Sequence, residues 1–383
     1  MKITHIALCG PVTDHMTYQD NLLPKFHKKM NFEVSMITSK YIWDKGFIGI
    51  DYRDKYKNEY GIKTIRLESK FSTNINSKLK LYKNLYEVLL DENPDILFIH
   101  GVQFLNIIDI IKYVKMHAHV KIFVDNHADF SNSARTWLSK NILHKILWRK
   151  MAKMIEPYTT KFYGVLPARV KFLEDIYKLP IKKLDLLLMG ADDEKVSKAS
   201  YQETILDIKR KYNLEDGDFI IVTGGKIDHS KRQILNLMKS VDNINDKRIK
   251  LIVFGSVDKD LEQAVFDFTS NHSIQYIGWI NDEESYKLFA AANLMVFPGR
   301  HSVYWEQVVA LGRPLIVKYW EGTTHIDIKG NCQFLYEDTE EEMTQILKKV
   351  IYDQSLYKEM LEAASSNLKE TFLYSNIAKR SIS

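Results

Sequence analysis

The stretch that constrains the fold most strongly runs from Phe219 to Lys231 and reads FIIVTGGKIDHSK. Its apolar start predicts a buried strand, and the glycines Gly224 and Gly225 let the backbone approach a ligand closely. Lys226 and Lys231 flank this turn. An amphipathic helical pattern follows, so the free N–H groups of the first helical turn point to the same place. A strand, a glycine turn and a helix in this order indicate a parallel α/β sheet with an anion site at its edge.

A second strand end of this kind lies at Phe297–Ser302, which reads FPGRHS. It leads into a predicted helix over Val303–Leu311, which ends at the Gly-Arg-Pro sequence of residues 312–314. Two helix starts and several cations suit a ligand with two negative charges, such as a nucleotide diphosphate. The Gly-Gly-Lys sequence alone is weak evidence, and the ordered series from Gly224 to Pro314 carries the prediction.

The composition indicates an ordinary globular protein of two domains. The chain has 383 residues and 45% hydrophobic content, enough for two cores. The net charge of +5 favours an anionic ligand or an anionic membrane surface. Cys9 and Cys332 lie far apart without metal-ligand spacing, which argues against zinc and predicts a reducing, cytoplasmic location. The aromatic residues form no nucleic-acid motif, so no nucleic-acid partner is expected.

No membrane-spanning segment is predicted. The chain begins with the strand pattern of residues 3–9 rather than with a signal peptide. Its longest apolar run, Leu288–Pro298, has about half the length that a bilayer span requires. Any membrane attachment is therefore expected to be peripheral, on the inner face of the plasma membrane.

Residues 137–151, WLSKNILHKILWRKM, form an amphipathic pattern that would suit such attachment. The apolar side would carry Trp137, Ile142, Ile146 and Met151, with Lys140, Lys145 and Lys150 near its edges. The alternative interpretation is a helix that packs on its own sheet.

Both halves of the sequence alternate short apolar strands with amphipathic helices, the pattern of parallel sheets covered on both faces. The predicted strands are Ile3–Cys9, Glu33–Thr38, Lys63–Leu67, Asp95–His100, Val120–Asp125, Lys161–Leu166 and Leu184–Met189, then Phe219–Thr223, Lys250–Phe254, Ile274–Ile277, Leu294–Phe297 and Pro314–Lys318. The predicted helices include Thr17–Lys29, Lys78–Glu92, Gln103–His117, Tyr201–Tyr212, Lys231–Asn243, Asp258–Ser270 and Glu283–Ala292. A polar link near Glu194–Tyr201 would separate the domains.

The predicted fold class is therefore α/β, with two doubly wound, Rossmann-like domains that face each other across a cleft. The first domain is expected over residues 1–195 and would bind the acceptor. The second is expected over residues 196–365 and would bind the nucleotide. A helical tail over residues 366–383 is expected to return to the first domain.

These landmarks resemble the retaining glycosyltransferases of family 4, which have the two-domain GT-B fold. The family's phosphate element, Gly-Arg-x4-Lys, is similar to Gly225-Lys226 followed by Lys231. The family's strand-end glycine before the base pocket resembles Gly278, and the residue whose backbone contacts the nucleobase would be Trp279. The resemblance covers nearly the whole chain and keeps the order of the family's landmarks.

The first domain carries two further matches. The histidine after the family's fifth strand matches His127, in the sequence VDNHAD of residues 124–129, and the glycine loop after the first strand matches Gly10. The turn between the family's domains resembles Met189–Asp192. By this resemblance, His127 would hydrogen-bond the donor sugar or stabilise positive charge near the reacting carbon. The alternative is a turn histidine that caps the sheet.

The sequence departs from the family in the Glu-x7-Glu motif. Counting back from Gly312 puts Gln307 at the second acidic position, with Glu306 beside it, and Gly299 at the first. Neighbours on a helix differ by about 100°, so Glu306 and Gln307 are not expected to face the ligand equally. Gln307 would still hydrogen-bond ribose hydroxyls. The place of the first glutamate would be taken by Arg300, His301 or Ser302.

The resemblance implies the following site. The expected catalytic residues are His127, Lys226, Lys231 and Glu306. The expected donor-binding residues are Gly10, Gly224, Gly225, Gly278, Trp279, Arg300, His301, Ser302 and Gln307. No metal and no cofactor are expected, because lysines and helix N-termini can stabilise the leaving diphosphate.

The implied function is a retaining glycosyltransferase, hexosyl or N-acetylhexosaminyl. It would move a sugar from a nucleotide-sugar, by family frequency a UDP-sugar, to a glycan or lipid-linked acceptor in bacterial surface-polysaccharide or glycoconjugate assembly. Two alternatives stay open, since the fold alone does not decide among them. One is a non-catalytic GT-B subunit that binds a sugar or peptide and supports a partner transferase, as the altered Glu-x7-Glu motif suggests. The other is a sugar-nucleotide epimerase or hydrolase.

Overall fold

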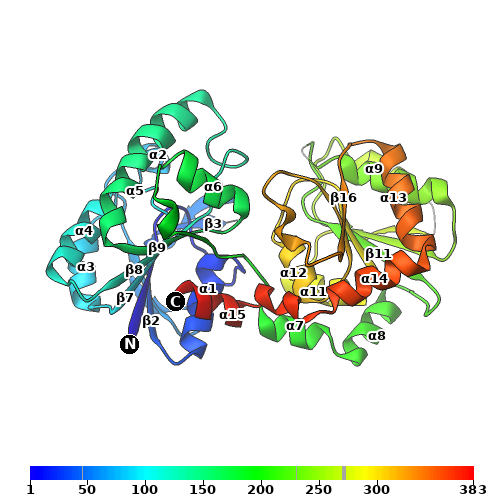
Figure 1. The fold of residues 1–383 in the computed structure, drawn as a ribbon, viewed down its shortest axis with the longest axis horizontal. Coiled ribbons are helices and arrows are strands. Elements are labelled where there is room, and N and C mark those ends of the chain that lie inside the picture. The colour runs from blue at the N-terminus through cyan, green and yellow to red at the C-terminus, as the bar shows by residue number, and fades with distance from the viewer. Residues whose placement is uncertain (45, 230, 270–272) are drawn as a thin grey trace. The chain divides into compact units, whose positions relative to one another are not determined.

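The protein consists of two α/β units, each with its own sheet (Figure 1). The computed structural model describes residues 1–44, 46–229, 231–269 and 273–383. The first unit contains Met1–Met189 and Ile377–Ser383, and the second contains Gly190–Asn376. The polar link predicted at Glu194–Tyr201 is instead mostly helix α7 (Asp193–Ala199), because the Asp192 side chain caps its first turn by accepting from an amide N–H.

The N-terminal sheet has eight strands in the order β10-β9-β8-β7-β1-β2-β6-β5. All neighbours are parallel except β5, which runs antiparallel to β6. The bounds are β1 (Lys2–Ala7), β2 (Glu33–Ser39), β5 (Lys55–Lys57), β6 (Lys63–Leu67), β7 (Ile96–His100), β8 (Lys121–Asn126), β9 (Thr159–Gly164) and β10 (Leu184–Leu186). Every strand predicted in this half is confirmed. The short, charged β5 has no apolar run and was not predicted.

Helices cover both faces of this sheet (Figure 1). On one face, apolar side chains of α3 (Leu85–Glu92), α4 (Ile107–Met116), α5 (Arg149–Ile155) and α6 (Pro167–Asp175) join the strands in one core. On the other face lie α1 (Gln19–Lys29) and the C-terminal α15 (Tyr374–Ser381). Because the first unit includes Ile377–Ser383, the end of the chain is part of the N-terminal fold. A 3-10 turn over Asn367–Phe372 precedes α15.

The single helix predicted over Lys78–Glu92 is wrong. The structure has two helices, α2 (Thr73–Leu79) and α3, separated by an extended segment in which Lys80 and Asn84 adopt positive φ angles of 49° and 61°. Asn106 accepts from the amide N–H of Tyr82 and donates to its carbonyl, so a side chain replaces the helical hydrogen bonds. A further feature that was not predicted is a separate hairpin of β3 (Tyr41–Asp44) and β4 (Phe47–Ile50).

The C-terminal sheet has six parallel strands in the order β13-β12-β11-β14-β15-β16. The bounds are β11 (Phe219–Gly224), β12 (Ile249–Phe254), β13 (Ile274–Tyr276), β14 (Leu294–Phe297), β15 (Leu315–Lys318) and β16 (Cys332–Leu335). One face carries α9 (Gln233–Ile244), α10 (Glu262–Phe268), α13 (Glu340–Tyr352) and α14 (Gln354–Ala364). The unit also contains α8 (Gln202–Lys211), α11 (Asp282–Ala291) and α12 (Tyr304–Ala310). The end predicted for one helix at Ser270 lies outside the described residues.

Candidate functional site

The site of the C-terminal unit lies where the strand order reverses. From β11, the sheet extends through β12 and β13 on one side and through β14 to β16 on the other. Open parallel sheets bind ligands at the carboxyl ends of the strands at such a switch point. A cavity between the loops after β11 and β14 is lined by Thr223, Gly224, Lys231, Gly299, Arg300 and Ser302, among others. The structure therefore brings together much of the predicted phosphate-binding set.

Three glycines with positive φ follow neighbouring strands of this sheet. They are Gly225 after β11, Gly255 after β12 and Gly278 after β13, with φ of 112°, 117° and 71°. The amide N–H of Gly255 donates to the carbonyl of Gly278 at 2.8 Å. A Cβ atom on Gly255 would lie 1.9 Å from the carbonyl oxygen of Gly225, so only glycine fits there. These glycines leave bare backbone at the strand ends. Gly255 was not predicted, although a glycine directly after a predicted strand was a usable signal.

Lys231 is the central cation of this cavity. It lies just before α9, and a Cβ atom on Gly225 would be 3.5 Å from its ammonium nitrogen. Burial lowers the pKa of Lys231, Asp228 partly offsets this effect, and Arg300 adds to the lowering. A desolvated ammonium beside the N-terminus of a twelve-residue helix is well suited to a phosphate.

Lys226 is placed differently from Lys231. Its side chain is 57% exposed, and its ammonium lies 3.1 Å from Asp258 Oδ1 and 3.9 Å from Asp228 Oδ2. Lys226 is therefore engaged with carboxylates, whereas Arg300 lines the cavity with Lys231. Trp279, next to Gly278, has a largely exposed indole.

Glu306 is fully buried and binds two imidazoles. Its Oε1 atom accepts from Nε2 of His301 at 2.7 Å and from Nε2 of His325 at 2.8 Å. Burial opposes the negative charge, but the two imidazoles outweigh it and lower the pKa of Glu306 to about 2. His301 and His325 hold the Glu306 carboxylate from two sides. The fixed carboxylate in turn orients His301. His325 was not predicted, since it comes from a short 3-10 turn, Thr324–Ile326, that no motif marks.

The side-chain amide of Gln307 is available for a ligand, whereas the Glu306 carboxylate is already hydrogen-bonded. Among the residues that the structure describes, neither polar atom of the buried Gln307 side chain has a hydrogen-bond partner. The same holds for the hydroxyl of Thr223 at the cavity. Buried polar atoms normally have partners, so these groups are candidates to bind a ligand or ordered water.

In the N-terminal unit, His127 follows β8 and lies at one end of a buried polar network. Its Nε2 atom is 3.4 Å from Asp125 Oδ2, which also accepts from Nδ1 of His100 at 3.0 Å and from Gln19 at 2.9 Å. Burial opposes the charge of Asp125, but His100 and His127 outweigh it and lower the pKa of that carboxyl. Asp125 therefore orients His127, while the exposed side of His127 stays open to solvent.

The network continues from His100 as a chain of imidazoles. His100 Nε2 lies 3.0 Å from His5 Nδ1, and His5 Nε2 lies 3.0 Å from His27 Nδ1. His27 Nε2 lies 3.1 Å from the carbonyl of Ala378, in α15. A carbonyl only accepts, so His27 Nε2 carries a hydrogen, and each imidazole in turn donates through Nε2. The chain was not predicted, because its histidines come from separate elements.

This direction of donation requires a charged His100. Its Nε2–H donates to His5, so its Nδ1 must also carry a hydrogen to meet Asp125 and Asp20, at 3.0 and 3.2 Å. Burial opposes this charge, but the two carboxylates outweigh it and raise the pKa of His100. Burial holds the pKa of His5 well below its usual range and lowers that of His27 to about 4, so both are neutral.

Two groups of side chains place candidate metal ligands within 4.8 Å of one another: Asp20, His100 and His127, and His301, Glu306 and His325. In the second group, both imidazole Nε2 atoms lie at hydrogen-bond distance from one carboxylate oxygen. Hydrogen bonds thus account for this geometry without an ion.

The amphipathic segment of residues 137–151 forms a π-helix, Ser139–Trp148, that continues into α5. Trp137, Ile142 and Ile146 are exposed, as predicted for an apolar surface, but Met151 is buried and that assignment is wrong. Bonds from i to i+5 place residues four or five apart on one side, which gathers the three exposed residues. Met151 lies beyond the π-helix, in α5, and packs in the core of the N-terminal sheet. Within the described part of the chain, no helix is long and apolar enough to cross a membrane.

The comparisons with known proteins agree with this architecture. Residues 204–367 match the family model described as glycosyl transferases group 1. An uncharacterized glycosyltransferase of Methanocaldococcus jannaschii is 22% identical over 215 residues, which are 54% of this chain and 55% of the relative. The match thus spans about half the length of that curated relative.

Two of the solved structures that match almost the whole chain illustrate this likeness. Sucrose-phosphate synthase from Thermosynechococcus elongatus has a TM-score of 0.68 at 15% identity, covering 99% of this chain and 96% of that one. HepE from Anabaena, solved in complex with UDP, has a TM-score of 0.71 at 11% identity, covering 99% and 98%. Identities this low show the fold alone, and the fold is GT-B.

Proposed function

We propose that this protein is a retaining glycosyltransferase that uses a nucleotide-sugar donor, with UDP as the nucleotide. The observation that carries the proposal is the position of Lys231, a partly desolvated ammonium at the glycine turn of a switch-point cavity. The family match covers this cavity, and the neighbour HepE was solved with UDP. The sugar is a hexosyl or N-acetylhexosaminyl group, and the proposed location is cytoplasmic.

The reaction needs stabilisation of a leaving diphosphate. The bond from the anomeric carbon to the diphosphate oxygen breaks, and the diphosphate leaves with the electron pair. The acceptor hydroxyl forms the new bond on the same face and gives its proton to the leaving oxygen. Lys231 and Arg300 supply positive charge at the cavity without a divalent metal, supported by the α9 N-terminus.

The roles of the other polar side chains depend on which of them already have hydrogen-bond partners in the protein. The free amide of Gln307 is suited to ribose hydroxyls, whereas Glu306 is occupied by His301 and His325. Glu306 therefore acts by orienting His301, the residue between Arg300 and Ser302 of the cavity wall. In the N-terminal unit, Asp125 orients His127. The role proposed for His127 is a hydrogen bond to the donor sugar. The acceptor is a glycan or lipid-linked molecule of bacterial surface-polysaccharide or glycoconjugate assembly.

The proposal is tested by measuring thermal midpoints with UDP, GDP, ADP and CMP in EDTA, for the wild type and Lys231→Ala. At ligand near 100 times its dissociation constant, binding adds about 2.7 kcal/mol, which raises the midpoint by roughly several degrees. A shift with UDP that Lys231→Ala abolishes is expected. A shift with none of the nucleotides would overturn the proposal and favour the non-catalytic subunit. An epimerised sugar or free sugar formed without acceptor would favour an epimerase or hydrolase.

We also propose a peripheral membrane contact through the π-helix. Trp137, Ile142 and Ile146 are exposed beside Lys140, Lys145 and Lys150, a composition that suits an anionic interface. Each lysine near such a surface contributes about 1 kcal/mol. Replacing the three lysines by glutamine should therefore weaken sedimentation with phosphatidylglycerol vesicles by about 100-fold.

A matched triple variant at Lys115, Lys121 and Lys182, which are exposed elsewhere in the same unit, is the control for net charge. It should retain vesicle binding. Equal losses in the two triple variants, or no binding by the wild type, would remove the membrane contact from the proposal.

A further inference from the structure

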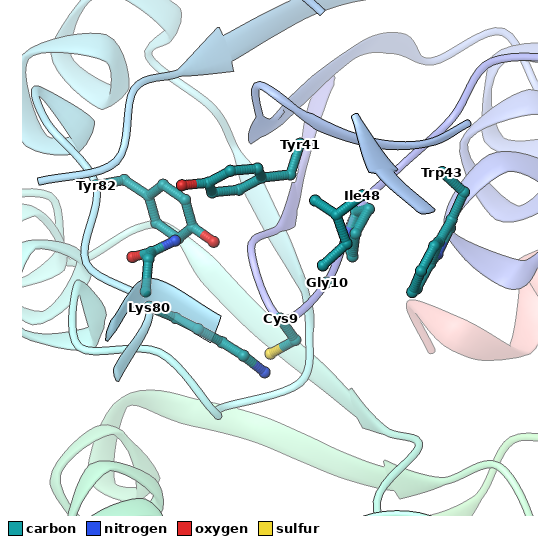
Figure 2. A pocket seen from close by; sticks show the side chains of 9 residues that line it. Cys9, Gly10, Tyr41, Trp43, Ile48, Lys80 and Tyr82 are labelled. Carbon is teal, nitrogen blue, oxygen red and sulfur yellow. The ribbon is translucent and has the colours of Figure 1, made fainter. Parts of the chain in front are cut away.

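A cavity of about 270 Å³ lies in the N-terminal unit beside the carboxyl ends of β1 and β2 (Figure 2). Its wall is mostly aromatic and apolar, with Tyr41 and Trp43 from β3, Ile48 from β4, and Tyr82 from the segment after α2. Figure 2 shows the two tyrosines together at one end, with Trp43 at the other. The strand order of this sheet reverses at β1, with β2 on one side and β7 on the other, so the cavity lies near a second switch point.

Lys80 supplies a cation to this apolar cavity. Its side chain extends toward Cys9 (Figure 2). No hydrogen-bond acceptor or carboxylate pairs with its ammonium in the part of the chain that the structure describes. Burial lowers the pKa of Lys80 and raises the pKa of the Cys9 thiol to about 12, so Cys9 provides no negative charge. An ammonium in apolar surroundings without a counter-ion is costly, which favours an anionic ligand.

The wall of the cavity continues onto an exposed apolar surface, the hairpin of β3 and β4. Trp43 is 41% exposed, Ile48 and Ile50 are each 46% exposed, and Phe47 is 78% exposed. Among the described residues, the hairpin pairs with no strand of the main sheet. Adjacent exposed apolar side chains on a globular fold indicate a binding surface. Trp43 and Ile48 belong to both the cavity and the hairpin surface.

We propose that this cavity binds the acceptor, and that the acceptor is a sugar joined through phosphate to an apolar chain. Lys80 pairs with the phosphate, the aromatic wall contacts the first sugar, and the chain lies along the hairpin. The inference rests on the proposed glycosyltransferase function and specifies its acceptor. A free sugar phosphate would leave the apolar hairpin uncovered, and a neutral lipid would leave Lys80 without a counter-ion. The combined chemistry of cavity and hairpin therefore favours a lipid-linked phosphosugar.

Titration calorimetry of the full chain with farnesyl diphosphate tests this inference, because the probe joins an apolar chain to phosphates. Lys80→Met should weaken binding by about 10- to 100-fold, the size of one charge-assisted hydrogen bond. Lys80→Arg should restore most of it. Trp43→Ala should weaken binding by about 10-fold, since an exposed side chain is removed without loss of the core. The matched control is Lys83→Met, whose ammonium pairs with Glu68 at 2.9 Å and which should bind like the wild type.

Inorganic pyrophosphate and farnesol, titrated separately, should each bind at least about 10-fold more weakly than the joined probe. Pyrophosphate binding as tightly would indicate a free-phosphate site, and farnesol binding as tightly would indicate a purely apolar one. Either result overturns the inference, as does unchanged affinity of a folded Lys80→Met.

Titration of the same samples with UDP separates this inference from the proposed function. The Lys231→Ala variant should no longer bind UDP, but it should bind farnesyl diphosphate like the wild type. Absence of probe binding with UDP binding intact overturns the acceptor assignment alone. Absence of UDP binding with probe binding intact overturns the proposed function alone.

Discussion

Replacing Lys231 with alanine is expected to lower turnover by about 100- to 1000-fold, because one donor aimed at developing charge contributes roughly 3–4 kcal/mol to the barrier. The effect should be this large because the ammonium is partly desolvated at the glycine turn, where the leaving diphosphate would gain charge. The measurement is the release of UDP from a UDP-sugar in the presence of an acceptor, under donor saturation. Loss confined to KM would contradict a role in the transition state.

Lys226→Ala is the matched comparison, since it removes the other lysine of the same turn. Lys226 is 57% exposed and already pairs with Asp258, so its removal should cost less than about 10-fold in turnover. Equal losses in the two variants would show that the family pattern assigns the phosphate contacts better than the geometry does. A near-normal Lys231→Ala enzyme would remove Lys231 from the catalytic set.

The strands and the phosphate loop were predictable because both depend on local sequence. Parallel strands buried on both faces are continuous apolar runs, so segments such as Phe219–Thr223 were identified nearly to the residue. The turn at Gly224 and Gly225 was identified because only glycine tolerates that backbone geometry and close approach. The single helix predicted over Lys78–Glu92 is wrong because Asn106, distant in sequence, hydrogen-bonds both backbone groups of Tyr82. These bonds take the place of the helical ones.

The parts of the site that the sequence did not reveal are assembled from distant segments. His5, His27 and His100 come from β1, α1 and β7, and no spacing rule relates them. His325 reaches Glu306 from a turn after β15. The altered Glu-x7-Glu motif suggested a degenerate site, but the structure places His301 against the neighbouring Glu306. Where the sequence departs from that pattern, the structure has a buried polar cluster of His301, Glu306 and His325.

Glu306 is expected to stabilise the C-terminal unit in a pH-dependent way. The pKa of this carboxyl falls to about 2 in the folded protein, against about 4.3 in an unfolded chain. A group whose pKa is lowered on folding stabilises the fold above its unfolded pKa, and this contribution disappears as the pH drops through the folded pKa. The difference between the folded and unfolded pKa values corresponds to about 3 kcal/mol of folding stability at neutral pH. This stability is lost between roughly pH 4 and pH 2.

Glu306→Gln keeps the size of the side chain and removes its charge, so it should lower the free energy of unfolding by about 3 kcal/mol at pH 7. For a unit of this size, the thermal midpoint would fall by roughly 6 to 12 °C. The gap between wild type and variant should narrow as the pH falls below about 4, because the wild-type carboxyl then takes up its proton. Midpoints measured by circular dichroism between pH 7 and pH 3 check this.

Glu284→Gln, at a partly exposed carboxylate paired with Lys211 in the same unit, is the control and should shift the midpoint far less. A gap that stays constant with pH would show that Glu306 is not the charged acceptor of His301 and His325, and that its contribution comes from packing alone.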